Sequence, residues 1–143
     1  MIAVDTNILV YSVREDSPLH EAALACISKL AESSGQWAIP WPCVHEFLAI
    51  ITHPKIYKPS MPTADALKQV SNWMESPSAV LLSERQGHWG HLSELAARSK
   101  ISGAQFHDAK IAAICLSNGV REFWTADRDF SRFPALRVKN PLV

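Results

Sequence analysis

The sequence predicts an α/β fold, a three-layer α/β/α sandwich with a central, mainly parallel sheet. Short apolar runs of strand length alternate along the chain with longer segments whose apolar residues recur at helical spacing. Strands separated by helices are joined by right-handed crossovers, which make the strands parallel and place helices on both faces of the sheet. The length suits one domain over residues 1–143.

The first third of the chain contributes two expected strands and two expected helices. Residues 2–4 are a short apolar run that stops at Asp5, as a buried strand ends at a turn. A Ser-Pro pair opens a helix over residues 17–31, where apolar side chains recur at helical spacing. Residues 36–40 are expected to form a second strand, and a proline then opens a helix over residues 42–51.

The rest of the chain repeats this alternation after a loop. Three prolines between positions 53 and 62 exclude regular structure, so this segment is expected to run over the surface. The expected helices are residues 63–74, 89–96 and 105–118, and the expected strands are residues 79–82, 122–125 and 136–138. Gly119 stands at the usual stop position of the last helix.

Composition indicates an ordinary globular protein with no strong electrostatic preference. Fourteen basic and 14 acidic side chains give a formal net charge of zero, with 48% hydrophobic and 20% charged residues. Binding to nucleic acid or to an anionic membrane would therefore need a local patch. No window has the roughly 20 apolar residues that span a bilayer, and Asp5 stands where a signal peptide needs a basic residue. We expect a cytoplasmic protein.

The cysteines give no sign of a zinc site. Cys26, Cys43 and Cys115 are odd in number, widely spaced and set among apolar residues, so we expect reduced, buried thiols.

Acidic side chains stand at the positions where such a fold binds ligands. Asp5 follows the first strand, Asp127 and Asp129 follow the fourth, Asp108 lies in the first turn of the last helix, and Glu46 lies near the start of the second. Taken singly, an acid in the first turn of a helix is most often structural, and a glutamate off the apolar stripe is most often solvated. Ligands of α/β sandwiches, however, bind beyond the carboxyl ends of the strands.

Together these acids predict a metal-dependent reaction. Carboxylates that converge in a mostly buried cleft repel one another and lose hydration, an arrangement that persists only if a cation compensates. Oxygen donors without thiol or imidazole partners select Mg²⁺ or Mn²⁺ over zinc. The chemistry that this site implies is metal-assisted hydrolysis of a phosphodiester bond.

Four segments that occur in order along the whole chain carry a family resemblance. They are Val4-Asp5-Thr6-Asn7-Ile8-Leu9, His45-Glu46-Phe47-Leu48, His107-Asp108-Ala109-Lys110-Ile111-Ala112-Ala113 and Trp124-Thr125-Ala126-Asp127-Arg128-Asp129-Phe130. Together they resemble the signature segments of PIN-domain ribonucleases, in the VapC toxin family. The resemblance implies a PIN-like fold and an endoribonuclease that depends on Mg²⁺ or Mn²⁺. It also implies a toxin of a type II toxin–antitoxin system, with an RNA substrate, a cognate antitoxin and a homodimeric state.

The resemblance also implies roles for the acids. Asp5 and Asp108 would be the principal metal ligands, Glu46 a ligand or water-positioning base, and Asp127 the fourth acid. Asp129 is the alternative fourth acid, or a cap for the turn at residue 130.

Neighbouring polar residues would support these acids. Thr6 and Thr125 would orient carboxylates or bind phosphate through their hydroxyls, and Asn7 would brace the turn at Asp5.

Basic and aromatic residues are candidates for contacts with RNA. A basic rim around the acids could come from Arg14, Lys55, Lys58, Lys110, Arg128 and Arg132, although such residues are as often only solubilising. Trp41, near a strand end, is the one tryptophan expected to be available for stacking on a base. The other four, Trp37, Trp73, Trp89 and Trp124, are expected in the core.

Two other functions remain open at this point. One is a PIN-like module that binds RNA or protein without cutting, although the complete set of acids argues against it. The other is a small-molecule phosphatase with Asp5 as nucleophile, but this chain has Asn7 where haloacid-type phosphatases carry a second aspartate.

Overall fold

The computed structural model describes residues 1–143 and contains one sheet of five parallel strands. The strand order is β3-β2-β1-β4-β5, with every neighbouring pair parallel. The strands are β1 (Ile2–Val4), β2 (Trp37–Pro40), β3 (Ala79–Leu82), β4 (Glu122–Trp124) and β5 (Val138–Lys139). The predicted α/β architecture with a parallel central sheet is therefore confirmed.

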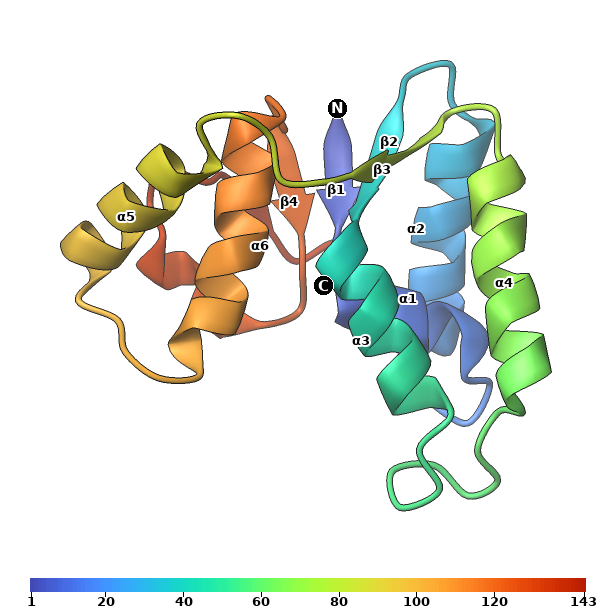
Figure 1. The fold of residues 1–143 in the computed structure, drawn as a ribbon. Helices are drawn as coiled ribbons and strands as arrows, with labels where there is room; N and C mark the ends of the chain where they lie inside the picture. The colour runs from blue at the N-terminus through green and yellow to red at the C-terminus, as the bar shows by residue number, and fades with distance from the viewer.

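Six α-helices flank the strands, with α5 and α6 on one side and α2 and α4 on the other (Figure 1). They are α1 (Thr6–Val13), α2 (His20–Glu32), α3 (Trp41–Ile51), α4 (Thr63–Glu75), α5 (His88–Ser99) and α6 (Gln105–Ser117), followed by a short 3₁₀ helix, η1 (Arg128–Arg132). All ten predicted helices and strands are present, with ends displaced by at most three residues. None of the helices combines the length and the apolar character needed to cross a bilayer.

Helix α1 is the element that the sequence pattern did not predict. Asp5 caps it, because its carboxylate accepts a hydrogen bond from the Thr6 amide at 2.7 Å. Ile8, Leu9 and Val10 are consecutive and all buried. A helix that is apolar on several sides shows no helical periodicity, which explains why the pattern was not recognisable.

The core also corrects one expectation about the tryptophans. Trp37, Trp73 and Trp124 are buried as expected, but Trp89 is 75% exposed. Trp89 lies in the first turn of α5, and Leu95, farther along, is the buried residue of that helix. The expectation that Trp89 packs in the core was wrong. Helical spacing shows which residues share a face of a helix, but not how far along the helix another element covers that face.

The three cysteines are free thiols, and two of them are buried as predicted. Cys43 and Cys115 are fully buried, whereas Cys26 is only half-buried.

Candidate active site

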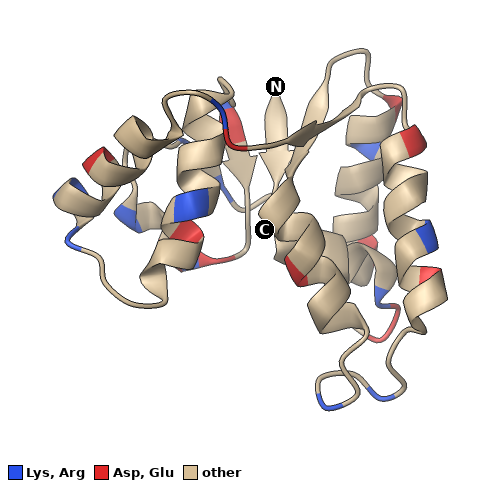
Figure 2. Ribbon diagram, viewed as in Figure 1, with Lys and Arg blue, Asp and Glu red and all other residues tan.

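The sheet order brings the predicted acids to one edge. Strand β1 lies between β2 and β4, and Val4 pairs with Trp124. Asp5 therefore leaves β1 next to the segment that leaves β4, and α3 starts directly after β2. Figure 2 shows acidic segments on α3, on α6 and on the loop after β4 around this end of the sheet.

Asp5 is buried and surrounded by hydrogen-bond donors. Its Oδ1 accepts from the Thr6 amide at 2.7 Å and lies 3.5 Å from the Cys43 sulfur, whose thiol donates to it. Its Oδ2 accepts from the Thr125 hydroxyl at 2.7 Å and from the Asn7 amide at 3.3 Å. The carboxylate is thereby held in one orientation at the end of β1.

Asn7 and Thr125 join the turn after β1 to the turn after β4. The Asn7 side-chain amide donates to the Thr125 hydroxyl at 3.2 Å, and the Asn7 oxygen accepts from the Ala126 amide at 3.0 Å. The Thr125 hydroxyl also accepts from the Asp127 amide at 2.9 Å. Two polar side chains thus set the position of Asp127 relative to Asp5.

Glu46 enters from α3 and is held by Thr6. The Thr6 hydroxyl donates to Glu46 Oε2 at 2.9 Å, across 40 residues of sequence. The other carboxylate oxygen, Oε1, has no hydrogen-bond partner within the chain.

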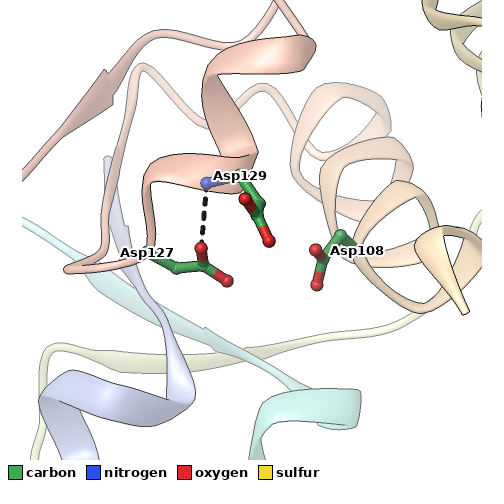
Figure 3. Close-up of side chains that lie close together, drawn as sticks. All are labelled: Asp108, Asp127 and Asp129. Atoms are coloured by element: carbon green, nitrogen blue, oxygen red, sulfur yellow. Dashed lines mark hydrogen bonds between the residues drawn. The ribbon is translucent and has the colours of Figure 1, made fainter.

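Three aspartates form a second cluster on the α6 side. One carboxylate oxygen each of Asp108, Asp127 and Asp129 can be chosen so that all lie within 4.8 Å of one another. Figure 3 shows Asp127 and Asp129 on the same turn, with Asp108 facing them from its helix. Asp127 Oδ1 accepts from the Asp129 amide at 2.8 Å, and Arg132 lies 3.6 Å from the Asp129 carboxylate.

This turn is anchored in the core. Phe130 of η1 is buried, and its ring lies 4.9 Å from that of Phe123 in β4. The packing fixes the backbone that carries Asp127 and Asp129.

One cavity of about 240 Å³ joins the two groups of acids. Asp5, Glu46, Asp108 and Asp127 all line it, whereas Asp129 does not. The structure therefore brings the four principal predicted residues to a single cavity.

Burial raises the pKa of two of these acids. Loss of hydration raises the pKa of Asp5 from 3.8 to about 6, although hydrogen bonds from Thr125 and Thr6 act in the opposite direction. Burial also raises the pKa of Asp108, with smaller contributions from the negative charges of Asp127 and Glu46. In both cases burial, and to a smaller extent neighbouring negative charge, disfavours the ionised carboxylate when no cation is bound.

The donor set fits a hard divalent cation. The cluster offers only carboxylate oxygens, with no thiolate or imidazole among them. Among the three aspartates only Asp129 forms an ion pair, with Arg132. A cation such as Mg²⁺ or Mn²⁺ would supply the missing charge, with Asp108 and Asp127 as the cavity-lining ligands.

The basic residues expected to contact RNA lie in different settings. Lys55, Lys58 and Arg128 are exposed. Lys110 lines a second cavity, of about 410 Å³, together with Trp41 and His45, and forms no ion pair. Arg14, in contrast, is engaged within the chain by Asp16 and by the loop after α3.

Two aromatic residues of the acid cavity were not anticipated as part of the site. Tyr11 and Tyr57 line it together with the acids. Tyr11 lies four residues after Asn7 on α1, so helical spacing would have placed it near the site had α1 been predicted. No local signal marks Tyr57, because its position depends on the path of a proline-rich loop.

Comparisons with known proteins agree with this architecture. The family model described as the PIN domain matches residues 2–136. A VapC ribonuclease of Mycobacterium bovis, Mb2897, is 30% identical over 99% of this chain and 96% of its own length. Ribonuclease VapC48 of Mycobacterium tuberculosis is 25% identical over 96% of this chain and 94% of its own length.

Solved structures share the fold at low sequence identity. VapBC-1 from nontypeable Haemophilus influenzae has a TM-score of 0.72 at 17% identity, with both chains fully covered. Mycobacterium tuberculosis VapC20, described as a toxin that cleaves the sarcin-ricin loop, has a TM-score of 0.67 at 15% identity, covering 92% of this chain and 93% of that one. From the family model and the sequence relatives together, the chain belongs to the PIN-domain family and, within it, to the VapC ribonucleases.

Proposed function

We propose that this protein is an endoribonuclease that hydrolyses RNA phosphodiester bonds with Mg²⁺ or Mn²⁺ and acts as the toxin of a toxin–antitoxin pair. The observation that carries the proposal is the single cavity lined by Asp5, Glu46, Asp108 and Asp127. Membership of the VapC ribonucleases supports the choice of RNA as the substrate.

Asp5, Asp108 and Asp127 would hold the metal, with Asp129 beside them. A bound divalent ion would lower the pKa of a water molecule and neutralise charge that develops on phosphate oxygens. Thr125 and Asn7 would keep Asp5 and Asp127 in register through the contacts described above.

Glu46 is the best-placed general base. Thr6 occupies its Oε2, which leaves Oε1 to accept a proton from the attacking water. As the water oxygen bonds to phosphorus, the bond from phosphorus to the leaving ribose oxygen breaks, and that oxygen takes up a proton from solvent water. Asp5 is buried, whereas Glu46, Asp108 and Asp127 are only half-buried, so solvent water can reach the cavity.

Lys55, Lys58, Lys110 and Arg128 remain candidates for contacts with the RNA backbone. Figure 2 shows basic segments on α6 and on the loop between α3 and α4, in addition to the acids. Local positive charge of this kind would attract RNA to a protein whose net charge is zero.

The partner and cellular setting belong to the same proposal. The solved structures that share the fold include VapBC-1 from Haemophilus influenzae and a toxin–antitoxin complex from Klebsiella pneumoniae. We infer a cognate antitoxin, a homodimeric state and a cytoplasmic location. Co-expression of this chain with the product of the adjacent reading frame would test the antitoxin, and light scattering would test the dimer.

The activity is tested by incubating the purified protein with total bacterial RNA in Mg²⁺, in Mn²⁺ and in chelator. We expect new RNA ends only with metal, and a loss of about a hundredfold or more in Asp5→Asn, Asp108→Asn and Glu46→Gln. Asp65→Asn, on the exposed face of α4, is the matched control and should cut normally. Cleavage that survives chelation, or that survives all three substitutions, would contradict the mechanism.

A further inference from the structure

The acid cavity is also lined by four apolar and aromatic residues, which are called the wall below. This wall consists of Val10 and Tyr11 from α1, Ile50 from α3 and Tyr57 from the loop after α3. Acids and an aromatic, apolar surface therefore share one cavity of about 240 Å³.

Arg14 holds Tyr57 in this wall. The Arg14 guanidinium lies over the Tyr57 ring, with 4.2 Å from Cζ to the ring centroid. Its Nη1 donates to the Pro59 carbonyl at 2.8 Å, and its Nε and Nη2 donate to the two Asp16 oxygens at 2.9 and 2.6 Å. The side chain is only 12% exposed, so little of it is left for another partner.

The loop itself is closed by backbone hydrogen bonds. The Tyr57 amide donates to the His53 carbonyl at 3.1 Å, and the Met61 amide donates to the Ile51 carbonyl at 2.9 Å. Because Arg14 follows the last residue of α1, and Asp5 caps the start of that helix, the loop and the acids are fixed to the same element.

The wall has the chemistry of a nucleobase site. Tyrosine rings stack on bases, and Val10 and Ile50 add apolar contact. Neither the Tyr11 nor the Tyr57 hydroxyl forms a hydrogen bond within the chain, so both can bond to the edge of a base. A volume of about 240 Å³ lies below the roughly 300–1,000 Å³ of pockets that enclose larger ligands, so it suits one base.

We propose that Tyr57, with Tyr11 and Ile50, seats one unpaired nucleobase of the RNA next to the bond that is cut, and that Arg14 is the positioning residue of Tyr57. The proposal rests on the proposed ribonuclease function. It gives Arg14 a different role from the RNA contact expected from the sequence. The proposal also predicts the preferred substrate, which is an RNA in which the base beside the cleaved bond is unpaired. A paired base cannot reach the wall residues inside the cavity.

The test begins with the base preference of the wild-type protein. New RNA ends are mapped by sequencing after cleavage of total bacterial RNA and of a single-stranded oligoribonucleotide pool with a randomised segment. We expect a preferred base at one position beside the cut. The best oligoribonucleotide is then made again with an abasic nucleotide at that position.

Tyr57→Ala and the abasic substrate form a double-mutant cycle. Each change alone should raise KM about tenfold with a smaller effect on kcat, and the two together should cost little more than either one. Tyr57→Phe should keep the binding that its ring provides and lose the part of the base preference that its hydroxyl provides. Arg14→Lys should lose part of both, because lysine lacks the planar fork that positions Tyr57. Trp89→Ala removes an exposed aromatic residue that lines no described cavity and should change nothing.

The outcomes separate this inference from the function on which it rests. If the wild-type protein cuts no RNA with metal, the proposed function fails. If it cuts with a preference that Tyr57→Ala and Arg14→Lys both retain, or if the effects of Tyr57→Ala and the abasic site are additive, the inference alone fails. Weaker antitoxin binding with unchanged RNA cleavage in Tyr57→Ala would assign the wall to the antitoxin and would also overturn it. Melting temperatures identify a misfolded variant, and if Tyr57→Ala is one, Arg14→Lys with the abasic substrate completes the cycle.

Discussion

The Thr125 hydroxyl donates a hydrogen bond of 2.7 Å to Asp5 Oδ2, across 120 residues of sequence. The Thr125 hydroxyl oxygen in turn accepts a hydrogen bond from the Asp127 amide at 2.9 Å. One side chain therefore orients the buried acid after β1 and the backbone that carries the acid after β4. Its removal affects both groups of carboxylates at once.

We expect Thr125→Val to lower RNA cleavage by about ten- to a hundredfold, the usual effect of losing a group that orients metal ligands. The substitution keeps the side-chain shape but removes a donor from Asp5 and an acceptor from Asp127, so the free energy of unfolding should fall by about 1–3 kcal/mol. Cleavage rates and urea denaturation measure the two effects. Thr125→Ser keeps the hydroxyl and should restore most of both, and a valine variant with wild-type activity would refute this role.

The raised pKa of Asp5 predicts how the stability of the metal-free protein depends on pH. Asp5 binds a proton more tightly in the folded state, at about pH 6, than in the unfolded state, where its pKa is near 3.8. The folded state is thus favoured by protonation at low pH, and this stabilisation is lost as the pH rises from about 4 to about 6. The difference of about two pKa units corresponds to at most about 3 kcal/mol.

The measurement is the melting temperature of metal-free wild type and Asp5→Asn between pH 4.5 and 7.5. As the pH rises, the melting temperature of the wild type should fall relative to that of Asp5→Asn, because the variant lacks the titrating carboxyl group. Added Mg²⁺ or Mn²⁺ should stabilise the wild type more at pH 7.5 than at pH 5. Parallel pH profiles of the two proteins would contradict the assignment to Asp5.

Asp127 and Asp129 are predicted to differ in importance. Asp127 lines the acid cavity, whereas Asp129 is exposed and lies near Arg132. Asp127→Asn should therefore weaken Mn²⁺ binding and cleavage at least about tenfold more than Asp129→Asn. Asparagine keeps an oxygen that can accept from the Asp129 amide, so the turn should stay folded. Calorimetric titration with Mn²⁺ measures the affinity of the two variants for the metal. Equal losses of affinity would contradict the prediction and indicate that both aspartates are ligands.

The second cavity predicts a phosphate contact at Lys110. Lys110 is half-buried and forms no ion pair, and Trp41 and His45 line the same cavity with ring centroids 6.0 Å apart. We expect Lys110→Ala to weaken RNA binding at all sequences alike and to reduce the slope of log K against log salt by about 1. Binding is measured in chelator to prevent cleavage. Lys68→Ala, on the exposed side of α4, should leave the slope unchanged, and an equal change in both variants would exclude a specific contact.

The fold class could be predicted from the sequence alone, and so could the four acids that line one cavity. Regular alternation of apolar runs with helical stripes is a local property, so it could be recognised without the structure. The acids could be selected because parallel strands present their carboxyl ends at one edge of the sheet, and Asp5 and Asp127 both follow strands.

Which side chains meet could not be predicted from the sequence. Helix α1 was not predicted because its consecutive apolar residues hide a helical period. Without this helix, the position of Tyr11 in the cavity could not be predicted either. The sequence predicts Arg14 as a free basic residue, but in the structure the loop that carries Tyr57 and Pro59 lies against it. The physical reason is the same in each case: hydrogen bonds and stacking contacts form between segments far apart in the sequence, and no local pattern encodes the partner.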